Sequence, residues 1–211
     1  MEIFKLVFSP IQVNTFVLAD HTGDCAIIDC GCYDRNEFSA LVDLIESKRL
    51  KPVLLLNTHC HLDHIFGNRF VLDKYGLSPW SNELEEPNRK NAADHALLFG
   101  LSMDIPPEPA GFISDQQKIV FGGTTLIALN VPGHTAGSVA FYSESDGCVF
   151  TGDALFAGSI GRSDLPGGDF ETLLKSIKSQ LLTLPGQTVV YSGHGHETTI
   201  EREKNTNQYL I

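Results

Sequence analysis

Apolar and polar positions along the first thirty residues follow a pattern typical of short β-strands. Apolar side chains recur at residues 3–8, 16–18 and 26–28, and turn-forming sequences interrupt them at 9–10 and 21–24. The pattern predicts a three-stranded antiparallel meander at the start of the chain.

The next segment changes to helical spacing. Asp34 or Asn36 is expected to cap this helix, and residues 53–56 predict the strand that follows it. Residues 65–75 predict a second helix that ends at Gly76. The first helix has apolar residues at positions i, i+3, i+4 and i+7, namely Phe38, Leu41, Val42 and Ile45.

Strands return in hairpin-like order in the second half of the chain. They are followed by an apolar helical stripe from Phe170 to Leu181 with Asp169 as its N-cap, a strand at 188–192 and a polar helix from about Thr199. Two meanders, each followed by helices, predict an α/β (α+β) fold with two sheets face to face and helices outside. The strands of the second meander are expected at 119–121, 124–130, 137–143 and 148–151.

One segment differs in composition from the rest of the chain. Residues 82–109 are polar and proline-rich around a helical piece near 92–103, which predicts an inserted lid or flank. The remaining pattern and a content of 42% apolar residues in 211 predict a single domain over 1–211.

The net charge and the cysteine content favour some classes of partner and location over others. A formal net charge of -11 disfavours a nucleic-acid partner, because phosphates are bound by clustered Lys and Arg. The N-terminus does not resemble a secretory signal, and no apolar run approaches the ~20 residues of a membrane span. Five cysteines without framework spacing indicate reduced thiols. These features predict a cytoplasmic protein without a membrane partner, and they leave open whether it is a monomer or a small homo-oligomer.

The strand at 53–56 runs directly into a cluster of metal-binding residue types. His59, His61, Asp63 and His64 place three imidazoles and a carboxylate within six residues, a combination that suits a transition metal and not a packed core. The cluster therefore predicts a metal site in a loop between a strand and a helix.

Three other apolar strands also end in ligand-type residues beside glycine. His134 follows the strand at 124–130, Asp153 follows 148–151, and His194 follows the strand at 188–192. Seven ligand side chains are too many for one tetrahedral ion and suit two ions that share a bridging carboxylate, with a hydroxide held between them. Imidazoles and carboxylates without thiolates favour two zinc ions, with iron or manganese as alternatives.

The order of these motifs resembles the metallo-β-lactamase superfamily over nearly the whole chain, and its fold would be a four-layer αββα sandwich. The closer resemblance is to the glyoxalase II branch (hydroxyacylglutathione hydrolase-like proteins), in a short single-domain form, through residues 152–156 and 158–169. The superfamily motifs are His59-Cys60-His61-Leu62-Asp63-His64, Pro132-Gly133-His134, Thr151-Gly152-Asp153 and Ser192-Gly193-His194.

The resemblance implies a role for each ligand-type residue. Asp63 would also accept a hydrogen bond from the nucleophile, which makes it a catalytic candidate. Asp29 matches an Asp-Pro-Gly element of the family, with Cys30 in place of the proline, and would support a ligand or simply form a turn; His196 would support a ligand or lie free. The implied ligand sets are His59, His61 and His134 for one metal, Asp63, His64 and His194 for the second, and Asp153 as the bridge.

The implied activity is hydrolysis of small acyl thioesters by a metal-bridging hydroxide. Full-length glyoxalase II enzymes continue into a helical domain that helps to bind glutathione, whereas only residues 195–211 follow the last motif here, so the acyl group and thiol carrier stay open. Arg162 and Lys204 are the nearest basic candidates for binding an anionic substrate, and a surface ion pair is the alternative role for each.

Two other functions fit the same residues. A persulfide dioxygenase would use one iron held by His59, His134 and Asp153, and its sequences share the element seen at residues 161–164. A non-enzymatic, metal-stabilised binding scaffold is the second alternative, but structural zinc sites are usually closed and rich in cysteine. Metal content separates the first alternative from a binuclear hydrolase.

Overall fold

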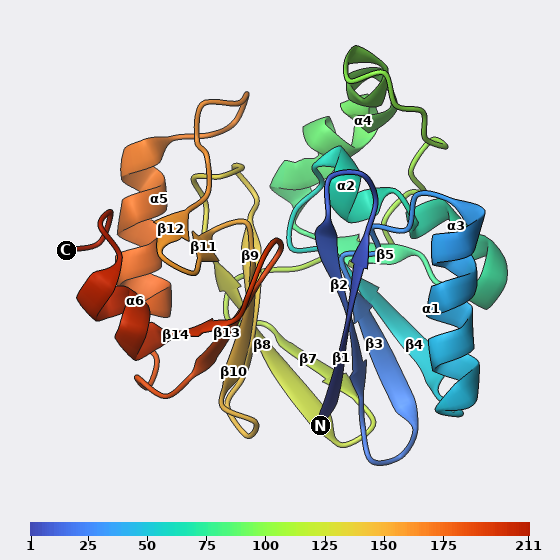
Figure 1. Ribbon diagram of the computed structural model, residues 1–211, viewed down its shortest axis with the longest axis horizontal. Coiled ribbons are helices and arrows are strands. Elements are labelled where there is room, and N and C mark those ends of the chain that lie inside the picture. Colours follow the sequence, from blue (N-terminus) through green and yellow to red (C-terminus); the bar gives the residue numbers. More distant parts are fainter. The chain divides into compact units, whose positions relative to one another are not determined.

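The computed structural model describes residues 1–211, which form two compact units. The first unit comprises residues 1–112 and 120–124, and the second comprises 113–119 and 125–211. Six-stranded sheets and helices build both units (Figure 1). The prediction of a single domain over the whole chain stays a prediction.

The first sheet has its strands in chain order, β1-β2-β3-β4-β5-β6. β1 to β3 pair antiparallel, which confirms the predicted meander, and β3 to β6 pair parallel. Pro52 lies in β4 where the register with β3 shifts, a position at which a strand tolerates the missing N–H. The strands are β1 (Glu2–Phe8), β2 (Val13–Ala19), β3 (Asp24–Ile28), β4 (Lys51–Leu56), β5 (Pro79–Ser81) and β6 (Gly111–Phe112).

Helix α1 (Arg35–Ser47) begins where the sequence predicted. The Asp34 side chain accepts hydrogen bonds from the N–H groups of Asn36 and Glu37, so Asp34 is the N-cap. Leu41 and Ile45 of α1 pack into one buried cluster with sheet residues such as Ile27 and Leu55. The helix thus covers one face of the first sheet.

The predicted helix at 65–75 is two helices, α2 (Leu62–Ile65) and α3 (Asn68–Tyr75). The break falls at Gly67, whose N–H donates to the carbonyl of Cys30 over 2.8 Å. A Cβ at Gly67 would lie 2.5 Å from Cys30 Sγ, so the chain passes too close to the core for a side chain. Gly76 ends α3 with a φ of 72°, as predicted.

The segment between β5 and β6 contains a short 3-10 turn, η1 (Glu83–Glu85), and helix α4 (Glu86–Leu98). The predicted helix at 92–103 was therefore placed about a turn and a half too late. Pro87 lies in the first turn of α4, where its missing N–H costs nothing. Proline therefore marks the start of the helix more reliably than the apolar residues near its end. Those apolar residues, Leu98 and Phe99, are exposed.

The second sheet has the order β14-β13-β10-β9-β8-β7, and a separate hairpin pairs β11 with β12. Neighbouring strands from β8 to β10 are antiparallel, whereas β10 and β13 are parallel. The strands are β7 (Lys118–Phe121), β8 (Thr124–Asn130), β9 (Val139–Ser143), β10 (Cys148–Gly152), β11 (Leu155–Phe156), β12 (Ser159–Ile160), β13 (Val189–Ser192) and β14 (Thr198–Thr199).

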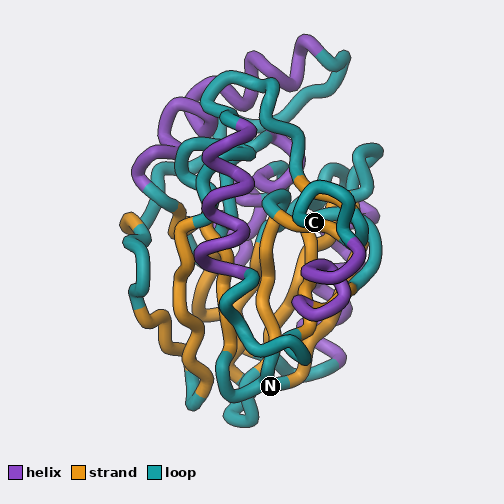
Figure 2. Tube along the Cα trace, turned by 90° about the vertical axis from the view of Figure 1, so that its left-hand side faces the viewer, coloured by secondary structure: helices purple, strands orange, loops and turns teal.

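Helices cover the second sheet on the side that faces the viewer in Figure 2. Asp169 caps α5 (Phe170–Ser176), which continues as a π-helical turn η2 (Ile177–Leu181), and Thr199 caps α6 (Ile200–Thr206). Both caps agree with the predicted helix starts. None of the helices has the length and apolar character needed to cross a membrane.

Candidate metal centre

In the first unit, the ligand-type residues follow β4 and are supported by Asp29 at the end of β3. Asp29 is buried and has a φ of 51°, which aims its carboxylate at the loop after β4. Its Oδ1 accepts from Thr58 N (2.8 Å), and its Oδ2 accepts from Thr58 Oγ1 (2.6 Å). The same Oδ2 lies 2.9 Å from His64 Nδ1. One buried carboxylate therefore holds both ends of this loop.

These contacts fix which ring nitrogens face away from Asp29. Because the Thr58 hydroxyl donates to Asp29, it accepts from His59 Nδ1 over 3.1 Å. His64 Nδ1 likewise donates to Asp29, so Nε2 carries the lone pair in both rings. His64 Nε2 lies 3.7 Å from Asp63 Oδ2. The loop thus presents imidazole Nε2 atoms beside a carboxylate, a combination that can bind a divalent metal.

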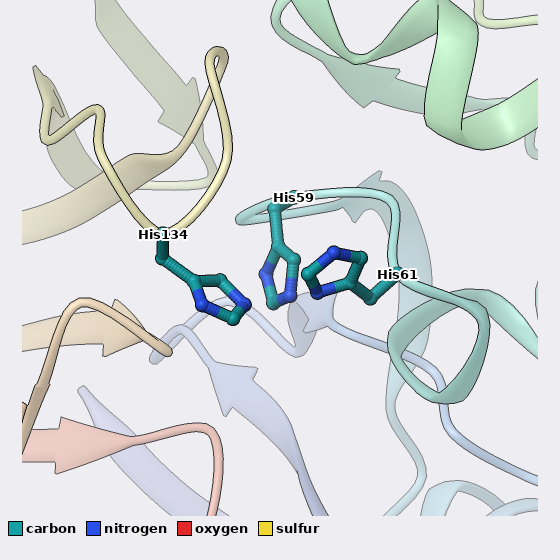
Figure 3. Close-up of side chains that lie close together, drawn as sticks. All are labelled: His59, His61 and His134. Carbon is teal, nitrogen blue, oxygen red and sulfur yellow. The ribbon is translucent and has the colours of Figure 1, made fainter. Parts of the chain in front are cut away.

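The imidazoles of the first unit lie against one another. The ring centroid of His59 is 4.8 Å from that of His61, at an interplanar angle of 85°, and 4.0 Å from that of His64. Figure 3 shows His59 and His61 on the loop after β4, and His134 on the loop after β8. Ligand atoms of Asp29, His59 and His64 lie within 4.8 Å of one another.

In the second unit, three strand-end residues converge in the same way. His134 Nε2 and His194 Nε2 lie 3.7 and 3.6 Å from Asp153 Oδ2. His134 Nδ1 is 2.7 Å from the carbonyl oxygen of Arg162, to which it donates, so Nε2 is again the nitrogen that can bind a metal. The predicted ligand residues of this unit therefore share one place.

Gly161 lets the chain come close to this second group. A Cβ at Gly161 would lie 1.9 Å from the carbonyl oxygen of Asp153 and 3.2 Å from His134 Nδ1. Any side chain here would move Asp153 or His134. The glycine is therefore required by close approach and not by its dihedral angles.

The remaining predicted residues lie at the surface. Arg162 donates from Nε and Nη2 to both carboxylate oxygens of Asp164 at 2.8 Å, and this pairing lowers the pKa of Asp164 to about 2. Lys204 on α6 and His196 between β13 and β14 are exposed. The surface ion pair foreseen for Arg162 is present, whereas the substrate-binding roles of Arg162 and Lys204 stay predictions.

One buried residue was missed by sequence reasoning. The Glu85 carboxylate is fully buried and accepts the N–H of Cys60 over 2.8 Å, between two of the loop histidines. Nothing in the sequence distinguishes Glu85 from Glu83 or Glu86, because all three stand in one acidic run. The contact of Glu85 with Cys60 becomes visible only when the segment after β5 and the loop after β4 are packed together.

The chemistry of these groups suits a borderline divalent metal. Imidazoles and carboxylates are typical ligands of zinc, iron and manganese. The thiol within the cluster, Cys60, is buried, and burial raises its pKa well above the usual range, so it stays protonated. The donor set is therefore nitrogen and oxygen, as the sequence predicted.

The chain matches the family model of the metallo-β-lactamase superfamily over residues 9–194. It belongs to that superfamily. The hydroxyacylglutathione hydrolase GloC of Haemophilus influenzae is 35% identical over 212 residues, which cover 100% of this chain and 98% of that protein. The superfamily and the glyoxalase II-like resemblance read from the motifs are thereby confirmed.

Solved structures agree with this assignment. The B3 metallo-β-lactamase BLEG-1 matches with a TM-score of 0.92 and 32% identity over 100% of both chains. TTHA1623, solved in a di-iron-bound form, matches with a TM-score of 0.89 and 36% identity over 98% of this chain and 100% of that one. The metallo-β-lactamase-like α/β fold class is therefore confirmed, and the chain is a metallo-hydrolase of this superfamily.

Proposed function

We propose that this metallo-hydrolase is a binuclear enzyme that cleaves small acyl thioesters. The observation that carries the proposal is the donor set. His64 Nε2 lies beside the Asp63 carboxylate in the first unit, and two Nε2 atoms lie beside Asp153 in the second, while the Nδ1 atoms of His59, His64 and His134 bind other partners. The name of the GloC relative, a hydroxyacylglutathione hydrolase, supports the substrate class.

The proposed ligand assignment follows the superfamily motifs. Asp153 would hold both ions as a shared ligand, and its position beside both His134 and His194 supports that role. The di-iron-bound form of TTHA1623 supports a binuclear site but leaves zinc, iron or manganese open here. His59, His61 and His134 would hold one ion, and Asp63, His64 and His194 would hold the other.

When bound, such a metal pair supplies an activated water and polarises the thioester carbonyl. The protein's own groups prepare for this step. Asp29 and Thr58 hold the Nδ1 atoms of His59 and His64 so that Nε2 is left to bind a metal, and the Arg162 carbonyl does so for His134. Asp63 would accept a hydrogen bond from the water that the metal activates and so orient it. The thiolate leaves without a general acid, because a simple thiol has a pKa near ~8.5.

The test combines metal analysis with a substrate panel. Protein purified without added metal is analysed for its elements and then assayed, metal-loaded, with S-lactoylglutathione and simple acyl thioesters. We expect about two ions per chain and thioester hydrolysis. The matched control is His196→Ala, which removes an exposed histidine outside the ligand set.

Two results would contradict the proposal. Absence of thioester hydrolysis by fully loaded protein would remove the substrate class. A single iron with oxygen uptake on glutathione persulfide would instead establish the dioxygenase alternative. Three further points stay predictions. They are a cytoplasmic location, a small-molecule substrate without nucleic-acid partners, and a monomeric or small homo-oligomeric state.

A further inference from the structure

Helix α4 packs on the loop that carries the first-unit histidines. Ala92 of α4 lies in one buried cluster with Cys60 and Ile65, and Leu62 and Met103 border this cluster. The segment at 82–109, expected as a lid or flank, therefore covers the inner side chains of the histidine loop within the first unit.

Arg89 ties the two ends of this covering segment together. Its buried guanidinium donates from Nε to Glu86 Oε1 at 2.6 Å, from Nη2 to Glu108 Oε2 at 2.9 Å and from Nη1 to the carbonyl of Pro106 at 3.1 Å. Hydrogen bonding to Arg89 lowers the pKa of Glu86 to about 2. Because a planar guanidinium fixes several partners at once, the segment is held as one piece.

Glu85 connects this piece to the histidine loop. Its Oε2 accepts from Cys60 N at 2.8 Å and from Asn88 Nδ2 at 3.0 Å. A fully buried carboxylate is costly unless it is hydrogen-bonded, and bonds to a charged acceptor are about twice as strong as neutral ones. The contact is therefore a strong one between two segments 25 residues apart.

The bonded N–H belongs to the peptide between His59 and Cys60. The orientation of that peptide helps to set the directions of the Cα–Cβ bonds of His59 and Cys60, and Cys60 leads directly into His61. Asp29 already fixes the peptide between Asn57 and Thr58, one residue before His59, through the N–H of Thr58. Glu85 fixes a second peptide of the same loop, the one between His59 and Cys60, through the N–H of Cys60.

We propose that Glu85 is a positioning residue, which holds His59 and His61 at metal-binding geometry from the covering segment. The proposal rests on the proposed function only in taking these histidines as ligands. Groups that support metal ligands from outside typically contribute about 10- to 100-fold in metal affinity.

Three variants test this role. Glu85→Ala removes the acceptor, Glu85→Gln keeps a carbonyl acceptor for the Cys60 N–H but removes the charge, and Glu83→Ala is the exposed control on the same 3-10 turn. The readouts are the zinc Kd from chelator competition and the d–d absorption bands of the Co²⁺-substituted protein, which report ligand geometry. The urea unfolding midpoint of the metal-free form is measured in parallel.

For Glu85→Ala we expect zinc binding about 10- to 100-fold weaker and shifted Co²⁺ bands. Glu85→Gln should restore both towards wild type, and Glu83→Ala should match wild type. A folded Glu85→Ala protein with wild-type zinc affinity and unshifted bands would overturn the proposal. If the alanine variant does not fold, Glu85→Met, which keeps the buried volume without the acceptor, takes its place under the same expectations.

These readouts are independent of the substrate. If the wild-type protein fails to cleave thioesters while Glu85→Ala still loses zinc affinity, the proposed function fails and the positioning role stands. If thioesters are cleaved and the affinity of Glu85→Ala is unchanged, the positioning role fails and the proposed function stands.

Discussion

The two units support their ligand-type side chains by different means. In the first unit, His59 and His64 are almost fully buried, and both are backed by the Asp29 carboxylate, directly or through Thr58. In the second unit, the His194 side chain is 25% exposed, and His134 is backed by a main-chain carbonyl.

The difference shows two ways to orient a metal-binding histidine. A carboxylate fixes the ring and also makes it a better donor, but it must itself be kept charged inside the protein. A main-chain carbonyl fixes the ring without adding charge, and it depends on the path of the backbone. The support of the histidines in the first unit is therefore expected to be lost when one side chain, Asp29, is replaced. The support of His134 in the second unit is expected to be lost when a side chain is added beside the backbone.

The largest effect should come from removing the carboxylate of the second unit. We expect Asp153→Ala to lose most of both metal ions and about a thousandfold in kcat/KM, because the proposed bridging ligand would serve both positions. Elemental analysis and thioester kinetics measure this. Retention of two equivalents of metal by the variant would contradict the bridging role.

Asp29→Asn tests the carboxylate that supports the first unit. The amide cannot accept from Thr58 N, Thr58 Oγ1 and His64 at once, so the unfolding free energy of the metal-free protein should fall by about 2–3 kcal/mol. Urea titration measures it. Asparagine tolerates the positive φ of Asp29, so Asp29→Ala, which adds backbone strain, should be the worse variant. Wild-type stability of Asp29→Asn would show that the charge is dispensable.

Gly161→Ala tests the backbone dependence of the second unit. The new Cβ would collide with the Asp153 carbonyl, so we expect about a tenfold loss of metal affinity by chelator competition. Gly158→Ala in the same hairpin is the control, because it meets only backbone strain at φ +75° and open space. Equal losses in both variants would mean that hairpin strain, not contact with Asp153, is responsible.

The smallest effect concerns the pH dependence of the covering segment. Arg89 depresses the pKa of Glu86 to about 2, so the ionised pair stabilises the fold above the ordinary glutamate pKa of about 4.3 and loses this contribution as pH falls towards 2. Glu86→Gln should therefore be less stable than wild type at pH 6, by under about 1 kcal/mol. Urea midpoints at pH 6 and pH 3 should show the gap narrowing; a constant gap would contradict the pairing.

Much of the candidate site could be predicted from the sequence because its residues follow strands directly. His134 and Asp153 come after apolar runs that can only be buried strands, and glycines mark the turns beside them. Asp34 and Asp169 likewise signal helix starts through their own hydrogen-bonding chemistry. Such local signals lie within a few residues of the feature that they specify.

Features that depend on contacts between distant segments could not be predicted. The break at Gly67 exists because Cys30 lies against it, and the role of Glu85 exists because Cys60 offers an N–H. The extent of α4 was misjudged because Leu98 and Phe99 are apolar yet exposed, so hydrophobic periodicity extended the helix beyond its end.

The order of strands within each sheet has a consequence for biosynthesis. Every strand from β2 to β6 is hydrogen-bonded to the strand made just before it. The second sheet adds its strands in the same order, with only the β11–β12 hairpin passed over. Contacts that are close along the chain cost little loop-closure entropy. Each sheet can therefore grow by one edge as the nascent chain leaves the ribosome, without waiting for a distant partner strand to be translated.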